Sequence, residues 1–324
     1  IGWILWALLV AATLGTVIVH GKRLTALIVI GAVGLVVSMI FVYLSAPDLA
    51  LTQLLVEMVT IALMMMALNY LPKQSKASRR PLRKLRDIGI ATLAGGGLAV
   101  LAYAMMMSPA DTISSELLVR ALPEAYGRNV VNVTLVDFRG FDTFGEITVF
   151  GIAALVVHAL LRRTRMAPEQ IMPGPPIKLP VPADLAQIMF PLTLTVSIFL
   201  FLRGHNAPGG GFIAGLVTAV ALALQYIANG LEWMDQRLRL NYQRIAGFGV
   251  LIAGLTGLGS WAFGRPFLTS AFGHFELPLV GEFELATAML FDLGVYLTVV
   301  GATLLVLVNL GRLSLAPPAS EEIH

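Results

Sequence analysis

One acidic residue inside a long apolar stretch constrains this chain more than any other feature. Glu57 is the only charged residue in Leu51–Leu71. That stretch can cross a bilayer as a helix, since a span takes about 20 apolar residues. A charged side chain at such a depth is expensive unless protein or water surrounds it, and such residues are typically functional. The sequence therefore predicts a membrane protein whose interior shelters an acid.

Other stretches are equally apolar. The chain is 57% hydrophobic and 13% charged, which is about half the charged fraction of a soluble domain. Because the bilayer core offers the backbone no hydrogen-bond partner, these stretches must be helices. We expect an all-α polytopic transmembrane protein with nine spans: Ile1–His20, Leu24–Leu44, Asp48–Leu71, Ile88–Met107, Phe141–Leu161, Leu185–Leu202, Gly210–Asn229, Ile245–Phe263 and Glu284–Leu310.

The basic residues indicate how the chain is oriented. Most of the 22 Lys and Arg residues fall in the loops on one side of the predicted spans. Cytoplasmic loops carry this excess in membrane proteins. We therefore expect an external N-terminus and a cytoplasmic C-terminus. The net charge of +3 reflects this topology and does not indicate nucleic-acid binding.

The absence of cysteine excludes several kinds of chemistry. With no Cys in the chain, disulfides, thiolate-bound iron–sulfur clusters and Cys-ligated zinc are impossible. We expect no cofactor. The chain begins with Ile and lacks the charged start of a signal peptide, so we expect it to be part of something longer.

A proline-rich segment divides the chain. Residues 166–183 hold six of the 17 prolines and are typical of an extended linker. We predict a five-span membrane domain over 1–165 and a four-span membrane domain over 184–324. A join of this kind suggests two proteins fused in one reading frame.

The third span carries the first candidate ion site. Gln53, Glu57 and Thr60 follow one another at i, i+4 and i+7, so they share a helix face. Glu57 lies about 14 Å along the helix from its start at Asp48. A carboxyl group at that depth can exchange a proton along an ion pathway. The alternative is a protonated Glu that only bonds a neighbouring helix.

The fifth span begins with a second acidic group. Asp137 and Arg139 precede it, and Asp142 and Glu146 follow one turn apart. Two acids at that spacing repel unless they share a proton, bind a cation or pair with a base. An ion entry or exit with a transient Na⁺ at Asp142 and Glu146 is one interpretation. In the other, Asp142 caps the helix N-terminus.

Two more titratable residues lie inside predicted spans, one on the fifth span and one on the ninth. His158 lies on the fifth span, about 120° around the helix from Glu146. It could relay protons or be a packed, hydrogen-bonded histidine. Asp292 lies inside the ninth span, where Tyr296 and Thr303 share its face, so the same functional presumption applies to it as to Glu57.

The string Phe201–Gly215 breaks the helical pattern. Pro208 and the three glycines Gly209, Gly210 and Gly211 cannot continue a regular helix. The freed backbone amides could hold an anion or a carboxylate, with Arg203 and His205 supplying charge. The simpler interpretation is a tight turn between two helices.

These motifs resemble a known family. Ala46–Glu57 and Val136–Ile147 are similar to the C-terminal part of the large A-type subunit of Mrp-type cation/proton antiporters. Arg203–Gly215 and Leu290–Val299 resemble the B-type subunit of the same complex. The resemblance implies an A–B fusion without the N-terminal, channel-like part of A. All the lysines lie in loops, so the chain has no buried lysine of the kind that proton-channel subunits use.

The resemblance also implies a function. It implies a multi-pass subunit of a Na⁺/H⁺ antiporter in the bacterial inner (cytoplasmic) membrane, with C, D, E, F and G types of subunit, the rest of A and membrane lipids as partners. Residues matching Glu57 and Glu146, and less directly Asp142, lie on an ion pathway in that family. Two alternatives remain: a membrane-arm subunit of a hydrogenase- or complex I-like oxidoreductase, and a purely structural assembly subunit.

Overall fold

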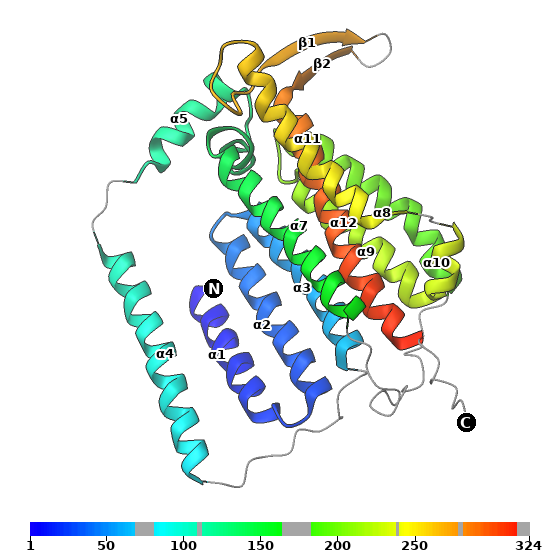
Figure 1. Ribbon diagram of the computed structural model, residues 1–324. Coiled ribbons are helices and arrows are strands. Elements are labelled where there is room, and N and C mark those ends of the chain that lie inside the picture. The colour runs from blue at the N-terminus through cyan, green and yellow to red at the C-terminus, as the bar shows by residue number, and fades with distance from the viewer. Residues whose placement is uncertain (69–80, 109–111, 164–182, 238–239, 278–280, 316–324) are drawn as a thin grey trace.

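The computed structural model describes residues 1–68, 81–108, 112–163, 183–237, 240–277 and 281–315 (Figure 1). Within these ranges, nine helices are long and apolar enough to cross a membrane. The predicted all-α polytopic membrane fold is thereby confirmed. The spanning helices are α1 (Gly2–Val19), α2 (Arg23–Tyr43), α3 (Pro47–Leu68), α4 (Pro81–Met107), α7 (Gly140–Arg163), α8 (Ala183–Arg203), α9 (Gly211–Asn229), α11 (Tyr242–Ala262) and α12 (Thr287–Leu315).

Short elements connect these helices. At one end lie α5 (Ser114–Ala125), α6 (Val130–Val133), the π-helix η1 (Thr134–Phe138) and the two strands, and Figure 1 shows these together at the top of the bundle. We call this the hairpin end. At the opposite end, α10 (Leu231–Arg237) joins α9 to α11.

The sequence did not predict the hairpin. β1 (Phe272–Leu277) and β2 (Gly281–Ala286) pair antiparallel, with Phe272 opposite Ala286. The predicted ninth span began at Glu284 and was wrong at that end, because residues 281–286 form β2 and α12 begins at Thr287. A strand of six residues beside an apolar helix has too little pattern of its own to be separated from it.

The two predicted domains pack on each other. The proposed linker lies outside the described residues except for Ala183, where α8 begins, so the division at 166–183 stays a prediction. In space, α3 packs on α9, and α7 packs on both α11 and α12. Helices α9 and α12 are the most buried spans, and α3, α7, α8 and α11 pack on one or both of them.

Small residues set the close packing of α11 on α12. A Cβ on Gly249 would lie 2.6 Å from the Gly294 carbonyl oxygen, and one on Gly294 would lie 2.7 Å from the Ala253 nitrogen. A Cβ on Gly301 would lie 2.5 Å from the Ala246 nitrogen. In a bilayer, where lipid is as apolar as Leu, close backbone approach of this kind is a main source of helix association.

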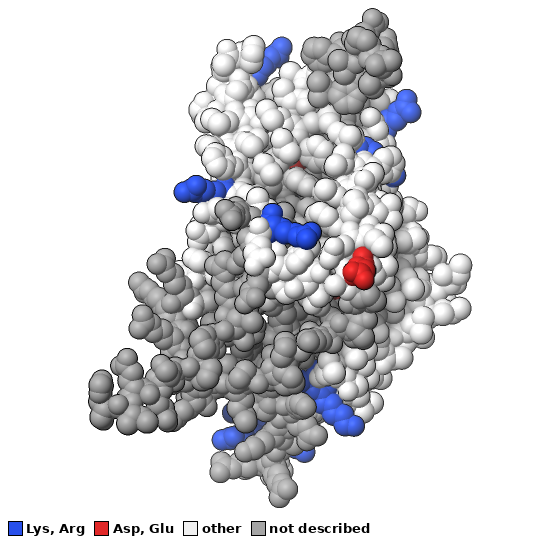
Figure 2. Space-filling model, turned by 90° about the vertical axis from the view of Figure 1, so that its right-hand side faces the viewer, with Lys and Arg blue, Asp and Glu red and all other residues white. Residues whose placement is uncertain are grey.

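One face of the described molecule is mostly uncharged (Figure 2), and helix α4 buries no residue against its neighbours. On the face in Figure 2, the described surface is largely without charge, and the charged side chains visible there are mainly basic. Helix α4 has no buried residue, and Figure 1 shows it standing apart from the bundle. A Cβ on Gly95, Gly96 or Gly97 would meet nothing within 4 Å in the described structure.

We predict that Gly249→Leu destabilises the protein much more than Gly247→Leu does. The Gly249 side chain would collide with the backbone of α12, whereas a Cβ on Gly247 would meet nothing within 4 Å of the described structure. Overpacking of this kind costs about 1–3 kcal/mol. Thermal unfolding of the purified protein in detergent, followed by tryptophan fluorescence, measures the difference. Equal melting temperatures for the two variants would contradict the proposed role of the small-residue contact.

Candidate functional site

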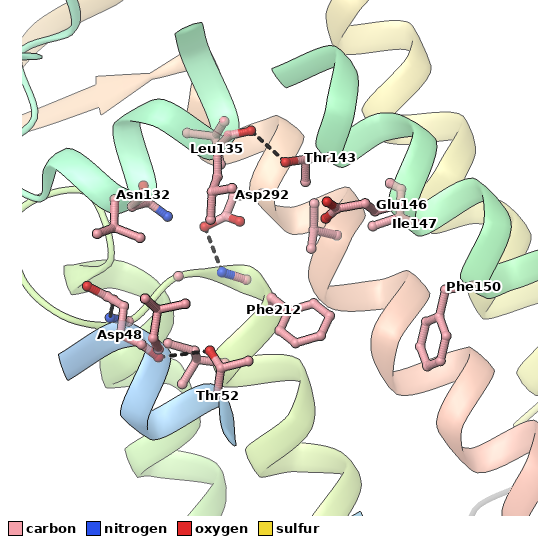
Figure 3. A pocket seen from close by; sticks show the side chains of 18 residues that line it. Asp48, Thr52, Asn132, Leu135, Thr143, Glu146, Ile147, Phe150, Phe212 and Asp292 are labelled. Atoms are coloured by element: carbon pink, nitrogen blue, oxygen red, sulfur yellow. Dashed lines mark hydrogen bonds between the residues drawn. The ribbon is translucent and has the colours of Figure 1, made fainter. Parts of the chain in front are cut away.

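A cavity lies near the hairpin end, where the two predicted domains meet (Figure 3). Its volume is about 280 Å³. Three carboxyl groups line it, from Asp48 on α3, Glu146 on α7 and Asp292 on α12. The rest of the lining is largely apolar and comes from the following residues: Leu49, Thr52, Val131, Asn132, Leu135, Val136, Thr143, Ile147, Phe150, Gly209, Gly210, Gly211, Phe212, Ile213 and Val295.

The segment Gly209–Gly211, which we call the glycine loop, leads into α9 and binds two of these acids. The Gly209 N–H donates to Asp48 Oδ1 at 2.9 Å, and the Gly211 N–H donates to Asp292 Oδ2 at 2.7 Å. Gly210, between them, has a φ of +102°, which residues other than glycine strain to adopt. The freed amides therefore hold carboxylates of the chain's own α3 and α12, and the segment also makes the turn between two helices.

Asparagines complete this polar cluster. The side-chain amide of Asn129 lies within hydrogen-bond distance of Asp48 Oδ1 (3.3 Å) and of the Gly204 carbonyl oxygen (3.0 Å). Asn132 hydrogen-bonds the Asp292 side chain. Asp48 and Asp292 are 7% and 8% exposed, so burial makes these bonds necessary, because an unpaired buried carboxylate is very costly.

Sequence reasoning missed Asp48, Asn129 and Asn132. Asp48 was placed only as the first residue of a span, although it belongs to the motif Ala46–Glu57. The two asparagines lie between the fourth and fifth predicted spans, outside the apolar stretches. The signal that could have found Asp48 is its position beside Pro47 at the entrance to an apolar helix, where an acid needs a partner.

Glu146 lies at the rim of the cavity. Its side chain is exposed, and within the described residues it makes no hydrogen bond and no ion pair. The nearby Thr143 hydroxyl donates to the Leu135 carbonyl oxygen at 2.7 Å, which holds the start of α7 against η1. Among the residues that line the cavity, Leu49 of α3 and Phe150 of α7 are exposed at the surface.

Glu57 does not line the cavity. Its carboxyl group lies against Gly34 of α2, where a Cβ would overlap it, and close to Gly31. The Gln53 amide donates to Glu57 Oε2 at 3.5 Å, and Thr60 is half-buried on the same helix. The glycines of α2 therefore make the space that admits this acid between two helices.

The two aspartates near the start of α7, Asp137 and Asp142, lie in different environments. Arg139 Nε donates to Asp142 Oδ2 at 2.7 Å, and both side chains are exposed. Helix α7 begins at Gly140, so Asp142 lies in its first turn, and the alternative in which it caps the helix is wrong. Asp137 is half-buried, and burial raises its pKa against the opposing effect of hydrogen bonds from Ser270.

The remaining candidates are not part of the cavity. His158 Nδ1 lies 2.9 Å from Asn309 Oδ1, where α7 contacts α12. His205 Nε2 lies 2.8 Å from the Ala125 carbonyl oxygen. The Arg203 guanidinium lies over the Phe199 ring, 5.2 Å from its centre. Among the described residues, no group of three or more His, Cys, Asp or Glu side chains could hold a metal ion.

Three family models match successive parts of the chain. Residues 7–73 match the model of the D-type subunit of MBH, and residues 82–176 match the model of its E-type subunit. Residues 181–305 match "Domain related to MnhB subunit of Na+/H+ antiporter". The glycine loop and Asp292 belong to the third match, whereas Asp48 and Glu57 belong to the first.

Known antiporter subunits are similar to the same regions of this chain. The chain is 45% identical, over 97% of its length, to the A/B-type subunit of a "Probable K(+)/H(+) antiporter" of Rhizobium meliloti (strain 1021). It is 51% identical to the B-type subunit of the "Na(+)/H(+) antiporter" of Bacillus subtilis (strain 168), over 37% of this chain and 85% of the relative. The chain spans 35% of the length of the Rhizobium relative.

A solved structure has the same fold. A chain in the "Structure of Mrp complex from Dietzia sp. DQ12-45-1b" matches with a TM-score of 0.82 and 33% sequence identity. The match covers 95% of this chain and 34% of the solved one. The arrangement of both predicted domains is therefore shared with one part of a longer chain.

We predict that Asp48→Ala destabilises the protein more than Asp48→Asn does. Alanine leaves the buried Gly209 N–H without an acceptor, which costs about 1–3 kcal/mol, whereas the amide oxygen of asparagine can still accept this bond. Melting temperatures of the two purified variants measure the difference. If both variants melt together, Asp48 does not anchor the glycine loop.

Proposed function

Because the chain belongs to the family of Mrp-type antiporter subunits, with an A-type C-terminal part followed by a B-type part, we propose that it is a membrane subunit of a multisubunit cation/proton (Na⁺/H⁺) antiporter. In this proposal it contributes a carboxylate-lined ion pathway and surfaces that hold other subunits. The activity belongs to the whole complex, of which this chain is one part.

The cavity between α3, α7 and α12 is the observation that carries the proposal. A carboxyl group beside a membrane-embedded space can exchange a proton for a cation, because both compete for the same oxygens. Asp48 and Asp292 are held by backbone amides, and Glu146 is unpaired among the described residues. Glu146 is therefore the carboxyl group best placed to exchange a bound proton for a cation during transport.

The pathway continues along α3 towards Glu57. Thr52 lines the cavity one turn below Asp48, and Gln53 lies within hydrogen-bond distance of Glu57. Polar side chains thus follow the helix from the cavity to an acid about 14 Å farther into the membrane. Gln53 and Thr60 would carry ions or water between these acids. Asp142, Asp137 and Asp292 would act at the hairpin end, and His158 at the other end.

The orientation and surroundings follow from the charge pattern and the family. We place the N-terminus and the hairpin end outside and the C-terminus in the cytoplasm of a bacterium, with the chain in the inner membrane. The partners would be the C, D, E, F and G types of subunit, the channel-like N-terminal part of A, and lipids. The relatives' names differ between K⁺ and Na⁺, so both cations belong in the assay.

We predict that Glu57→Gln and Glu146→Gln abolish antiport without preventing assembly. Glutamine keeps the size and the hydrogen-bonding oxygen but cannot bind or release a proton. Cation-induced collapse of the pH gradient in everted vesicles, with Na⁺ and with K⁺, measures antiport. The amount of intact complex is measured in parallel by native electrophoresis.

Glu116→Gln is the matched control. Glu116 lies on α5, where it forms an exposed ion pair with Arg120 at 2.7 Å, and we expect normal antiport from this variant. Normal antiport from either the Glu57 or the Glu146 variant would argue strongly against the proposed pathway.

Two other functions give different results in these measurements. The matches to the D-type and E-type MBH models favour, as a second candidate, a membrane arm that couples ion flow to redox chemistry in partner subunits. Co-purification of iron- or nickel-containing subunits would decide for it. A purely structural role would show less complex in the glutamine variants but unchanged transport per complex.

A further inference from the structure

Glu146 is an acid in a membrane-spanning helix for which the described residues provide no hydrogen-bond partner. It lies within the membrane-spanning helix α7, its side chain is exposed, and no described residue bonds to it. Asp48 and Asp292, on the same cavity, are buried and hydrogen-bonded. An acid within a membrane-spanning helix is costly unless protein or water surrounds it, so we expect another group to cover Glu146.

The surface around Glu146 is apolar and open. The rim of the cavity is formed by Leu49, Leu135, Phe150 and Phe212, which are 36–46% exposed. Figure 3 shows Glu146 on α7 across the cavity from Asp48 and Thr52 on α3. We call this rim, with Glu146, the α3–α7 opening. Its apolar border suits another helix, and its single acid needs a hydrogen-bond donor.

Two other occupants fit less well. Lipid chains would cover the apolar rim, but they offer no hydrogen bond to the carboxyl group. A second copy of this chain, packed by a two-fold axis on the same face, would bring two Glu146 side chains together. Like charges that close repel unless they share a proton.

We propose that the α3–α7 opening is the docking site for a transmembrane helix of another subunit, and that this helix presents a basic or amide side chain to Glu146. The docked helix closes the cavity towards lipid and completes the environment of its unpaired acid. The inference rests on the proposed function only in placing the chain within a multisubunit complex.

The absence of cysteine makes this surface directly testable. Val149 follows Glu146 by almost one turn of α7 and is 67% exposed. In the complete complex in native membranes, Val149→Cys carries a benzophenone maleimide, and illumination attaches the probe to its neighbour. Leu255→Cys on α11, 56% exposed, is the control that shows whether the probe reaches membrane-facing positions.

We expect Val149→Cys to form a crosslink with a transmembrane helix of another subunit. Mass spectrometry should find Lys, Arg, His, Asn or Gln within one turn of the crosslinked residue. A crosslink to lipid, to a second copy of this chain or to a helix without such a donor would overturn the inference.

A second measurement tests the acid itself. In the Val149→Cys background, we expect Glu146→Leu to lower the crosslink yield about tenfold, because the partner's donor then loses its acceptor. Glu146→Gln, which still accepts a hydrogen bond, should keep most of the yield. Equal yields for leucine and glutamate would count against a donor on the partner.

The two proposals fail in different ways. Normal antiport from Glu146→Gln with an intact crosslink would overturn the proposed pathway and support the docking site. Loss of antiport from the same variant, with only lipid adducts at Val149→Cys, would do the reverse. The crosslink therefore needs no active transport to be informative.

Discussion

The tie between the glycine loop and two buried acids is the interaction on which the rest of this structure depends. Gly209 and Gly211 donate backbone hydrogen bonds to Asp48 and Asp292, which belong to helices far apart in the chain. A membrane interior offers no water to replace these bonds. The loop therefore joins the A-type part to the B-type part at one polar point, and the cavity forms beside that point.

Small residues allow the helices around this point to come close. Glycines bring α11 against α12, and Gly34 of α2 leaves room for the Glu57 carboxyl group. Glycine thus allows two helices to pack closely in one place and makes room for an acidic side chain in another. Around Glu146 the described structure offers no such neighbour, and helix α4 buries no residue in it.

The sequence predicted the spans well because apolar length alone identifies a membrane helix. It placed Glu57 and Glu146 inside the membrane for the same reason. It left two interpretations of Asp142 open, since the residue at which a helix begins depends on local geometry that apolar length does not reveal. It missed the hairpin. It also missed Asp48, because the role of this acid depends on a hydrogen bond from Gly209, which lies 161 residues away in the chain.

By itself, the sequence determined that this protein crosses the membrane repeatedly and carries acids at depth, because burial of apolar length and the cost of charge are properties of each segment. Its motifs also indicated the antiporter family. Only the tertiary structure decided which acids share a space. Asp48, Glu146 and Asp292 line one cavity because three helices converge beside one loop, whereas Glu57, farther along α3 than Asp48, lies against α2.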